Sequence, residues 1–358
     1  MHETKKRDIK YETIRVIAMF FVIFVHQLDK FSAEQLNPMI QQILHIILYT
    51  CNGLFFMLSG KFALSFNYEE KDCYKKYYFG KFVKIIIPTL FYMAIKEIYL
   101  MHFVFETEIT MKSFIRAFIL SVIEGYATTE YWFIYFLLAN LLVAPFVARI
   151  FRNMTNKEFY LFFVICLLCN ALTVYSQWLG HTFAVPFYLS GMNIYFFLGY
   201  FMDRISSTKK QKSIFMGAGI IGFALTFLSA EIGNTINIYD TVPTMTLVVC
   251  MIYIIIRDKI KVKKLKNVIL TVGKYSYSIY LLHVIFMDIT TWVFPYNNNM
   301  PIYIYIIIKT IMIAFSSFVV AFVLDNTIVK LLQTGIIQIK DKIKEKLLTK
   351  NQKLLTGE

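Results

Sequence analysis

The sequence predicts an all-α, polytopic integral membrane protein with about ten transmembrane helices and with both termini in the cytoplasm. Three observations lead to this prediction. Of the 358 residues, 58% are hydrophobic, which is more than a soluble chain of this size can cover with polar surface. Ten apolar runs have roughly the length needed to cross the ~30 Å hydrocarbon core of a bilayer. Lys and Arg are concentrated in alternate loops between those runs.

Each apolar run is expected to form a helix, because lipid offers backbone N–H and C=O groups no other hydrogen-bond partner. Residues 113–123 are apolar but short, and we expect an interfacial or re-entrant helix there. The ten predicted spans are residues 11–28, 40–66, 83–105, 131–150, 159–176, 185–202, 213–230, 241–256, 275–293 and 302–324.

The distribution of basic residues sets the orientation of these spans. With the N-terminus inside, the cytoplasmic segments receive 29 of the 37 Lys and Arg residues, the outer loops receive 3, and 5 fall within spans. Basic residues concentrate in cytoplasmic loops of membrane proteins. The asymmetry therefore favours ten spans, and an eleventh at residues 113–123 would invert every later loop.

The chain is expected to consist of a membrane domain, residues 1–330, and a basic cytoplasmic tail, residues 331–358. We expect the tail from residue 338 onward to form a helix along the inner leaflet. The formal net charge of +14 then reflects topology and attraction to anionic lipid headgroups. Membrane lipids are therefore an expected partner, and nucleic acid is not.

Two basic residues interrupt the first predicted span and mark a candidate functional face. Arg15 lies near its start and His26 near its end. Eleven residues turn an α-helix by three turns and roughly 20°, so both side chains project from one face, about 16 Å apart along the axis. Ionisable residues inside a membrane span indicate function by default. The two groups are too far apart for a direct contact and should serve different parts of one elongated ligand.

Five motifs occur in order along the chain. Together they resemble the acyltransferase family 3 membrane proteins, which acylate hydroxyl groups of cell-surface glycans. The resemblance covers residues 11 to about 324. The motifs are Tyr11-Glu-Thr-Ile-Arg15 with His26, Asn52-Gly-Leu-Phe-Phe-Met-Leu-Ser-Gly60, Tyr131-Trp-Phe133 with Pro145, Tyr195-Phe-Phe-Leu-Gly-Tyr200, and Tyr275-Ser-Tyr-Ser-Ile-Tyr-Leu-Leu-His283.

The resemblance implies an acyl-coenzyme A donor, acetyl-CoA or another short acyl-CoA, which acts as a co-substrate. No permanently bound cofactor and no metal are expected. His26 would be the general base, and Arg15 would hold the donor with support from Lys81 and Lys84. The family usually has Arg where this chain has these two lysines, and Lys lacks the bidentate fork of Arg. Ordinary cytoplasmic anchoring is the competing interpretation of Lys81.

Three further residues are candidates for contact with the acyl donor. Ser59 could be an acyl-enzyme nucleophile, although a close-packed Ser-Gly pair is the more common role in a membrane helix. His283 is placed about 12 Å into the ninth span from the inner side, and Tyr280 shares its face. His283 could position the thioester or share a proton path. A structural hydrogen bond to a neighbouring helix is the alternative for this histidine.

Candidate acceptor-binding residues occur at the outer start of the fourth span. Trp132 could stack on a sugar ring, with Glu130 and Tyr135 nearby to bind hydroxyl groups. The competing explanation is an aromatic belt, because all three tryptophans fall at outer ends of the predicted spans. Lys96, Glu97 and Lys309 also lie within spans. They are expected to pair with other helices or to line a hydrated cavity, and the sequence assigns them no role.

The principal functional hypothesis is an O-acyltransferase of the bacterial plasma or inner membrane that modifies a polysaccharide or glycolipid. A polysaccharide exporter or flippase is the alternative, because proteins of this appearance have been assigned export roles. An exporter needs a wide pore and no acyl donor. A membrane sensing or amino-acid uptake module is a third hypothesis.

Overall fold

The computed structural model describes residues 7–32, 35–67, 69–124, 131–181, 191–232, 243–260, 263–297 and 299–356. Within these ranges the regular structure is helical and no strand occurs. Seven helices are long and apolar enough to cross a membrane. The predicted fold class, an all-α polytopic membrane protein, is therefore confirmed.

The helices follow the order of the predicted spans. They are α1 (Ile9–Leu28), α2 (Pro38–Leu48), α3 (Thr50–Leu64), α4 (Cys73–Lys81), the π-helical η1 (Phe82–Ile86), α5 (Ile87–Tyr99), the π-helical η2 (Leu100–Val104), α6 (Met111–Glu124), α7 (Trp132–Arg152), α8 (Asn156–Trp178), α9 (Asn193–Ile205), α10 (Lys209–Ile232), α12 (Pro243–Lys259), the short 3₁₀-helix η4 (Lys263–Leu265), α13 (Lys266–Val293), α14 (Ile302–Leu324), the π-helical η5 (Asp325–Val329) and α15 (Lys330–Thr356).

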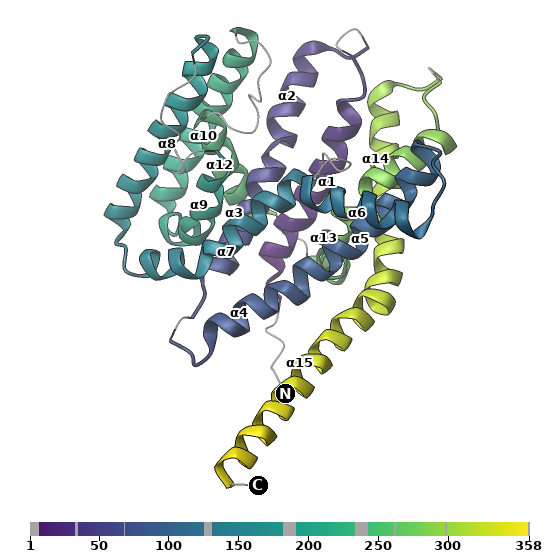
Figure 1. Cartoon of the computed structure of the whole chain (residues 1–358). Helices are drawn as coiled ribbons and strands as arrows, with labels where there is room; N and C mark the ends of the chain where they lie inside the picture. The colour runs from purple at the N-terminus through teal and green to yellow at the C-terminus, as the bar shows by residue number, and fades with distance from the viewer. Residues whose placement is uncertain are drawn as a thin grey trace.

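Helix α1 lies at the centre of the bundle and contacts α3, α12, α13 and α14. Figure 1 shows α8, α9, α10 and α12 on one side of it and α13 and α14 on the other. The helix formed by α4, η1 and α5 crosses the bundle obliquely (Figure 1). This arrangement surrounds the Arg15 and His26 face of α1 with other helices.

The second, third and ninth predicted spans differ from the observed helices. The helix of the third span begins at Cys73, ten residues before the predicted start. The second span is divided at Tyr49, where α2 ends and α3 begins. The ninth span begins at Lys266, nine residues before the predicted start. Residues 182–190, which include the start of the sixth predicted span, lie outside the described part of the chain. Residues 113–123 do form a helix, α6, which the Ser121 hydroxyl ties to Glu97 of α5 at 2.5 Å.

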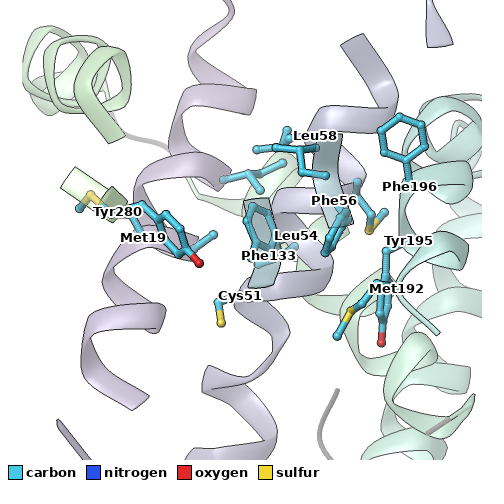
Figure 2. Close-up of a cluster of buried hydrophobic side chains, with 14 of the residues drawn as sticks. Met19, Cys51, Leu54, Phe56, Leu58, Phe133, Met192, Tyr195, Phe196 and Tyr280 are labelled. Atoms are coloured by element: carbon cyan, nitrogen blue, oxygen red, sulfur yellow. The ribbon is translucent and has the colours of Figure 1, made fainter. Parts of the chain in front are cut away.

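Helices α3 and α9 form a close contact in the core. A Cβ on Gly60 of α3 would collide with the backbone carbonyl of Phe196, and one on Gly199 of α9 would collide with that of Met57. Small residues let membrane helices approach to backbone contact in this way. Aromatic and aliphatic side chains, among them Phe56, fill the surrounding core (Figure 2).

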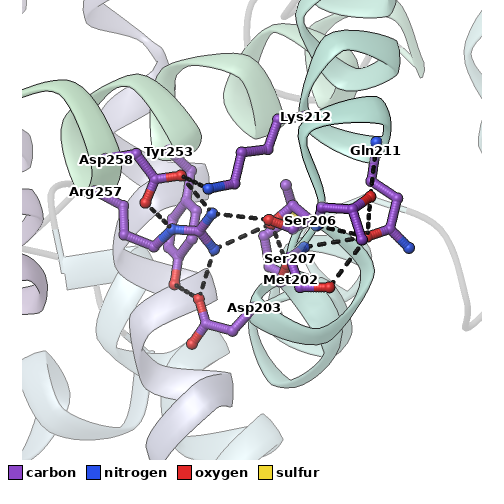
Figure 3. Close-up of polar contacts among 10 residues, drawn as sticks. Met202, Asp203, Ser206, Ser207, Gln211, Lys212, Tyr253, Arg257 and Asp258 are labelled. Atoms are coloured by element: carbon purple, nitrogen blue, oxygen red, sulfur yellow. Dashed lines mark hydrogen bonds and ion pairs between the residues drawn. The ribbon is translucent and has the colours of Figure 1, made fainter.

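An ionic network joins the ends of five helices, and Figure 3 shows its part on α9, α10 and α12. We call the side chains of Tyr11, Lys61, Asp203, Lys212, Arg257 and Asp258 the Asp203 network. Asp203 of α9 accepts hydrogen bonds from Tyr11 of α1 at 2.6 Å, from Lys61 of α3, and from Arg257 of α12 at 2.8 Å. Arg257 also makes two 2.8 Å contacts with Asp258, which pairs with Lys212 of α10 at 2.8 Å.

The basic tail forms the helix α15, which continues α14 through η5. Near its start the Gln333 amide donates to the Val83 carbonyl at 3.0 Å. Further along, the Lys340 ammonium lies 4.0 Å from the centre of the Phe79 ring. Beyond these contacts the helix extends away from the bundle (Figure 1). The proposed location of the tail on the inner leaflet stays a prediction.

Candidate active site

A pocket of about 280 Å³ opens among α1, α3, η1, α7 and α13. One part of its lining is basic, and the other is largely aromatic and aliphatic. An adjoining recess of about 180 Å³ shares Arg15 and Ser59 with it and adds Lys81. The pocket is lined by Arg7, Arg15, Phe55, Ser59, Lys84, Ile85, Phe133, Leu137, Gly273, Lys274, Ser276, Tyr277 and Tyr280.

Arg15 is held in the pocket by Glu12, one turn earlier on α1. The Glu12 carboxylate accepts a hydrogen bond from Arg15 Nη1 at 2.6 Å and one from Arg7 Nη1 at 3.4 Å. Glu12 is itself buried against α13, where a Cβ on Gly273 would collide with its carboxylate. The absence of a side chain at Gly273 thus leaves space for the group that orients Arg15.

The lysines of this region lie on a distorted helix. Pro88 has no backbone N–H, and a proline ring in a helix interior clashes with the carbonyl four residues earlier, which here is that of Lys84. The π-helix η1 occupies this turn. Single π-turns inside α-helices often mark functional positions. Lys84 lines the pocket and Lys81 lines the adjoining recess, while the Lys81 ammonium lies 5.3 Å from the centre of the Tyr77 ring.

Beyond the aromatic part of the pocket lie two histidines. The Tyr280 ring, which lines the pocket, is 5.3 Å from the His283 ring. The His283 ring in turn stacks on the His26 ring at 5.5 Å, with 26° between the ring planes. His283 is completely buried. Its Nδ1 lies in hydrogen-bond contact with the Tyr280 carbonyl, and its Nε2 has no partner among the described residues.

The structure brings most of the predicted acyl-donor residues together. Arg15, Ser59, Lys84 and Tyr280 share the pocket, and Lys81 lies in the adjoining recess. His283 lies at the depth of His26, which the predicted span boundary did not indicate, because α13 begins nine residues earlier than expected. The predicted sharing of a face by Tyr280 and His283 agrees with the contact between their rings.

The predicted acceptor residues lie in a different place from this pocket. Trp132 begins α7 with 41% of its surface exposed, and its ring contacts Phe133. The Tyr135 hydroxyl donates to the backbone carbonyls of Ser121 and Val122, at 3.1 and 2.9 Å, and so ties α7 to α6. Glu130 lies outside the described residues.

Sequence reasoning missed several pocket residues. Arg7 and Lys274 were counted only as cytoplasmic anchors, although both line the pocket. Tyr277, on the same face of α13 one turn before Tyr280, lines it as well and contacts the Thr89 hydroxyl at 2.6 Å. Helical spacing from Tyr280 back to Gly273 would have identified this face of α13.

A family model for an acyltransferase domain matches residues 8–324. The chain belongs to acyltransferase family 3. Searches of the curated proteins and of the solved structures found no significant match. Family membership shows that the protein is a membrane acyltransferase. The matched range includes every residue that lines the pocket except Arg7, together with both histidines and the Asp203 network, and it ends where α14 gives way to η5.

The arrangement places cationic groups at one end of α1 and an imidazole at the other. Arg7, Arg15, Lys84 and Lys274 present cationic N–H donors to the pocket, and such donors form strong charge-assisted hydrogen bonds with phosphate oxygens. His26 lies near the opposite end of α1, where an imidazole can accept a proton from an alcohol near neutral pH.

Proposed function

We propose that this acyltransferase moves an acetyl or other short acyl group from acyl-CoA to a hydroxyl of a cell-surface polysaccharide or glycolipid. It would do so in the plasma or inner membrane of a bacterium. The observation that carries the proposal is a chain of side-chain contacts that leads from a basic pocket to a histidine pair. Arg15 and Tyr280 line the pocket. The Tyr280 ring contacts the His283 ring, which stacks on the His26 ring.

The phosphates of the acyl donor would occupy the basic part of the pocket. A volume of about 280 Å³ is near the lower limit of ordinary ligand pockets, so it suits the pantetheine arm better than the whole donor. Along α1, Arg15 and His26 are about 16 Å apart. An extended arm of this order of length would present its thioester near the histidines while the nucleotide stayed on the cytoplasmic side.

The chemical step would be direct attack on the thioester. His26 takes the proton of the acceptor hydroxyl while the hydroxyl oxygen forms a bond to the thioester carbonyl carbon. Collapse of the tetrahedral intermediate breaks the carbon–sulfur bond, and the proton on His26 neutralises the departing thiolate. His283 positions the His26 ring by stacking on it. Contact between its own Nδ1 and the Tyr280 carbonyl fixes the orientation of the His283 ring.

The acceptor would approach His26 from the outer end of α1. Trp132 is half exposed at the outer end of α7, and an indole face can stack on a sugar ring. Glu130 and Tyr135 belong to the same proposed acceptor region. Ser59 lines the pocket, and we assign it contact with the donor.

Replacement of the proposed base tests this function. The purified protein, reconstituted in lipid nanodiscs, is given acetyl-CoA and surface glycan, and release of free CoA is followed together with the mass of the glycan. His26→Ala should lower the rate of transfer by 10²- to 10⁴-fold, the usual contribution of a general base. His102→Ala is the matched control, because His102 is an exposed histidine of η2 whose ring contacts Phe103.

Normal product formation by His26→Ala, with the control also active, would overturn the mechanism.

Deletion of the gene separates the proposal from the export hypothesis. Loss of ester groups from glycan that still reaches the surface supports the enzyme. Unmodified glycan that accumulates on the inner leaflet supports a transporter.

A further inference from the structure

The outer end of the acyl-donor pocket is formed by three aromatic rings from three helices. Helices α3 and α7 run toward the cytoplasmic side, and α13 runs away from it. On each helix, the pocket residue farthest from the cytoplasm is aromatic. These residues are Phe55 of α3, Phe133 of α7 and Tyr280 of α13. We call this group the aromatic wall.

The rings of the aromatic wall contact one another. The ring of Phe133 lies 5.5 Å from that of Tyr280, and the ring of Phe55 lies 6.0 Å from Phe133 and 6.5 Å from Tyr280. Figure 2 shows Phe133 and Tyr280 within the same buried cluster. Phe133 and Tyr280 are buried, with 5% and 8% of their surfaces exposed. Residues held this way in a close-packed core offer little free volume.

One layer of rings separates the pocket from the histidines. Tyr280 lines the pocket and also contacts His283, which stacks on His26. A thioester carbonyl that is to be attacked near His26 must therefore lie against the aromatic wall. The acyl chain attached to that carbonyl then has only the space that the three rings leave.

We propose that Phe55, Phe133 and Tyr280 set the length of the acyl group that the enzyme accepts and restrict it to short chains. This inference rests on the proposed function, because it assumes an acyl-CoA donor. It adds the residues that would determine acyl specificity, which the motifs of the family resemblance did not assign. Truncation of one ring should open apolar space for a longer chain, as engineered apolar cavities of about 150 Å³ admit small hydrocarbons.

The test compares acetyl-CoA with hexanoyl-CoA, which carries four more methylenes. In the wild type, kcat/KM for hexanoyl-CoA should be lower than that for acetyl-CoA by roughly tenfold or more. Phe133→Ala and Phe55→Ala should each raise the hexanoyl-to-acetyl ratio by roughly tenfold or more, since each newly buried methylene is worth about fourfold in affinity. Phe133→Leu and Phe55→Leu should move the ratio in the same direction by less, and they retain more of the core packing.

Phe136→Ala is the matched control. Phe136 lies on α7, three residues from Phe133, but 40% of its surface is exposed and its ring contacts Phe56 instead of the pocket. This variant should keep the wild-type ratio. The inference is overturned if the wild type uses hexanoyl-CoA as efficiently as acetyl-CoA. It is also overturned if the folded variants of the aromatic wall keep the wild-type hexanoyl-to-acetyl ratio. If the wild type neither binds nor turns over any acyl-CoA, the proposed function itself fails.

Discussion

Two groups of cationic side chains lie at the predicted cytoplasmic ends of the helices, and they differ in how their charge is balanced. In the Asp203 network, Lys61, Lys212 and Arg257 each contact a carboxylate. In the pocket region, the group formed by Arg7, Arg15, Lys81, Lys84 and Lys274 has Glu12 as its one ion-pair partner among the described residues. We call this second group the pocket cations.

The difference distinguishes a structural role from a binding role. A buried charge needs a partner to offset the cost of its desolvation, and the Asp203 network supplies that partner within the protein. Asp325, a carboxylate of η5, accepts hydrogen bonds from Tyr92 and Ser278 and forms no ion pair with the pocket cations among the described residues. The pocket cations thus retain an excess of positive charge, which favours an anionic ligand such as the phosphates of an acyl-CoA.

The largest effect is expected from loss of the network's central cation. Arg257→Ala leaves Asp203 and Asp258 without their shared partner, although Lys61 and Lys212 still contact them, and loss of hydrogen bonds to charged groups costs about 1.5–3 kcal/mol. The free energy of unfolding in detergent, measured by chemical denaturation, should fall by about this amount. The KM of the folded fraction for acyl-CoA should stay within twofold of the wild type. If Arg257→Ala raised KM without loss of stability, Arg257 would have a binding role and not the structural role assigned to the Asp203 network.

Removal of the principal pocket cation should have the opposite signature. Arg15→Gln keeps a hydrogen-bond donor for Glu12 but removes the charge from the pocket. Hydrogen bonds to charged groups contribute about 1.5–3 kcal/mol, so KM for acyl-CoA should rise by roughly 10- to 100-fold. Steady-state kinetics in nanodiscs measure this change, and the unfolding midpoint serves as the control. An unchanged KM would show that Arg15 does not hold the donor.

Salt should affect the two regions unequally. The Debye length shortens from about 10 Å at 0.1 M salt to about 3 Å at 1 M. Salt therefore screens the pocket cations more than the paired, partly buried cations of the Asp203 network. KM for acyl-CoA should therefore rise several-fold over this range, and the stability of the Asp203 network should change little. Lys84→Ala should show a weaker dependence of KM on salt than the wild type. Equal salt dependence in the two proteins would exclude Lys84 from donor binding.

The smallest effect is expected at the edge of the network. Lys212 pairs with Asp258 at 2.8 Å, but 36% of its side chain is exposed. Exposed ion pairs contribute about 0–1 kcal/mol, so Lys212→Ala should lower the free energy of unfolding by less than about 1 kcal/mol. Denaturation of this variant beside Arg257→Ala compares the edge of the network with its centre. If the two variants lost equal free energy of unfolding, the contribution of an ion pair in the network would not depend on its burial.

Much of the fold could be predicted from the sequence because each span carries its own signal. Apolar length and the distribution of Lys and Arg predict the helices one at a time. The relation between Arg15 and His26 could also be predicted, because both lie on α1 and helical geometry fixes their spacing. The missed start of α13 has a local cause: residues 266–274 include two lysines and a glycine, so they do not read as apolar.

Contacts between helices could not be predicted in the same way. The stacking of His26 on His283 depends on how far α13 is shifted along its axis relative to α1. The hydrogen bond between Asn140 and Asn193, at 2.9 Å, joins α7 to α9, and neither helix alone indicates its partner. Lys309 donates to the hydroxyl of Tyr305, one turn earlier on α14, and to that of Thr291 on α13, and spacing along α14 could indicate only the first of these contacts. Helical periodicity within one helix carries no information on such registers.

The uninterrupted passage from α14 into α15 links the two faces of the membrane mechanically. Residues Ile302–Thr349 form one helical segment of 48 residues, about 72 Å long at 1.5 Å per residue, whereas the hydrocarbon core is ~30 Å thick. A small change in the tilt of α14 at its first turn would therefore move the far end of α15 through several ångströms. A fluorescent label near the carboxyl terminus would report motions that begin on the opposite side of the bilayer.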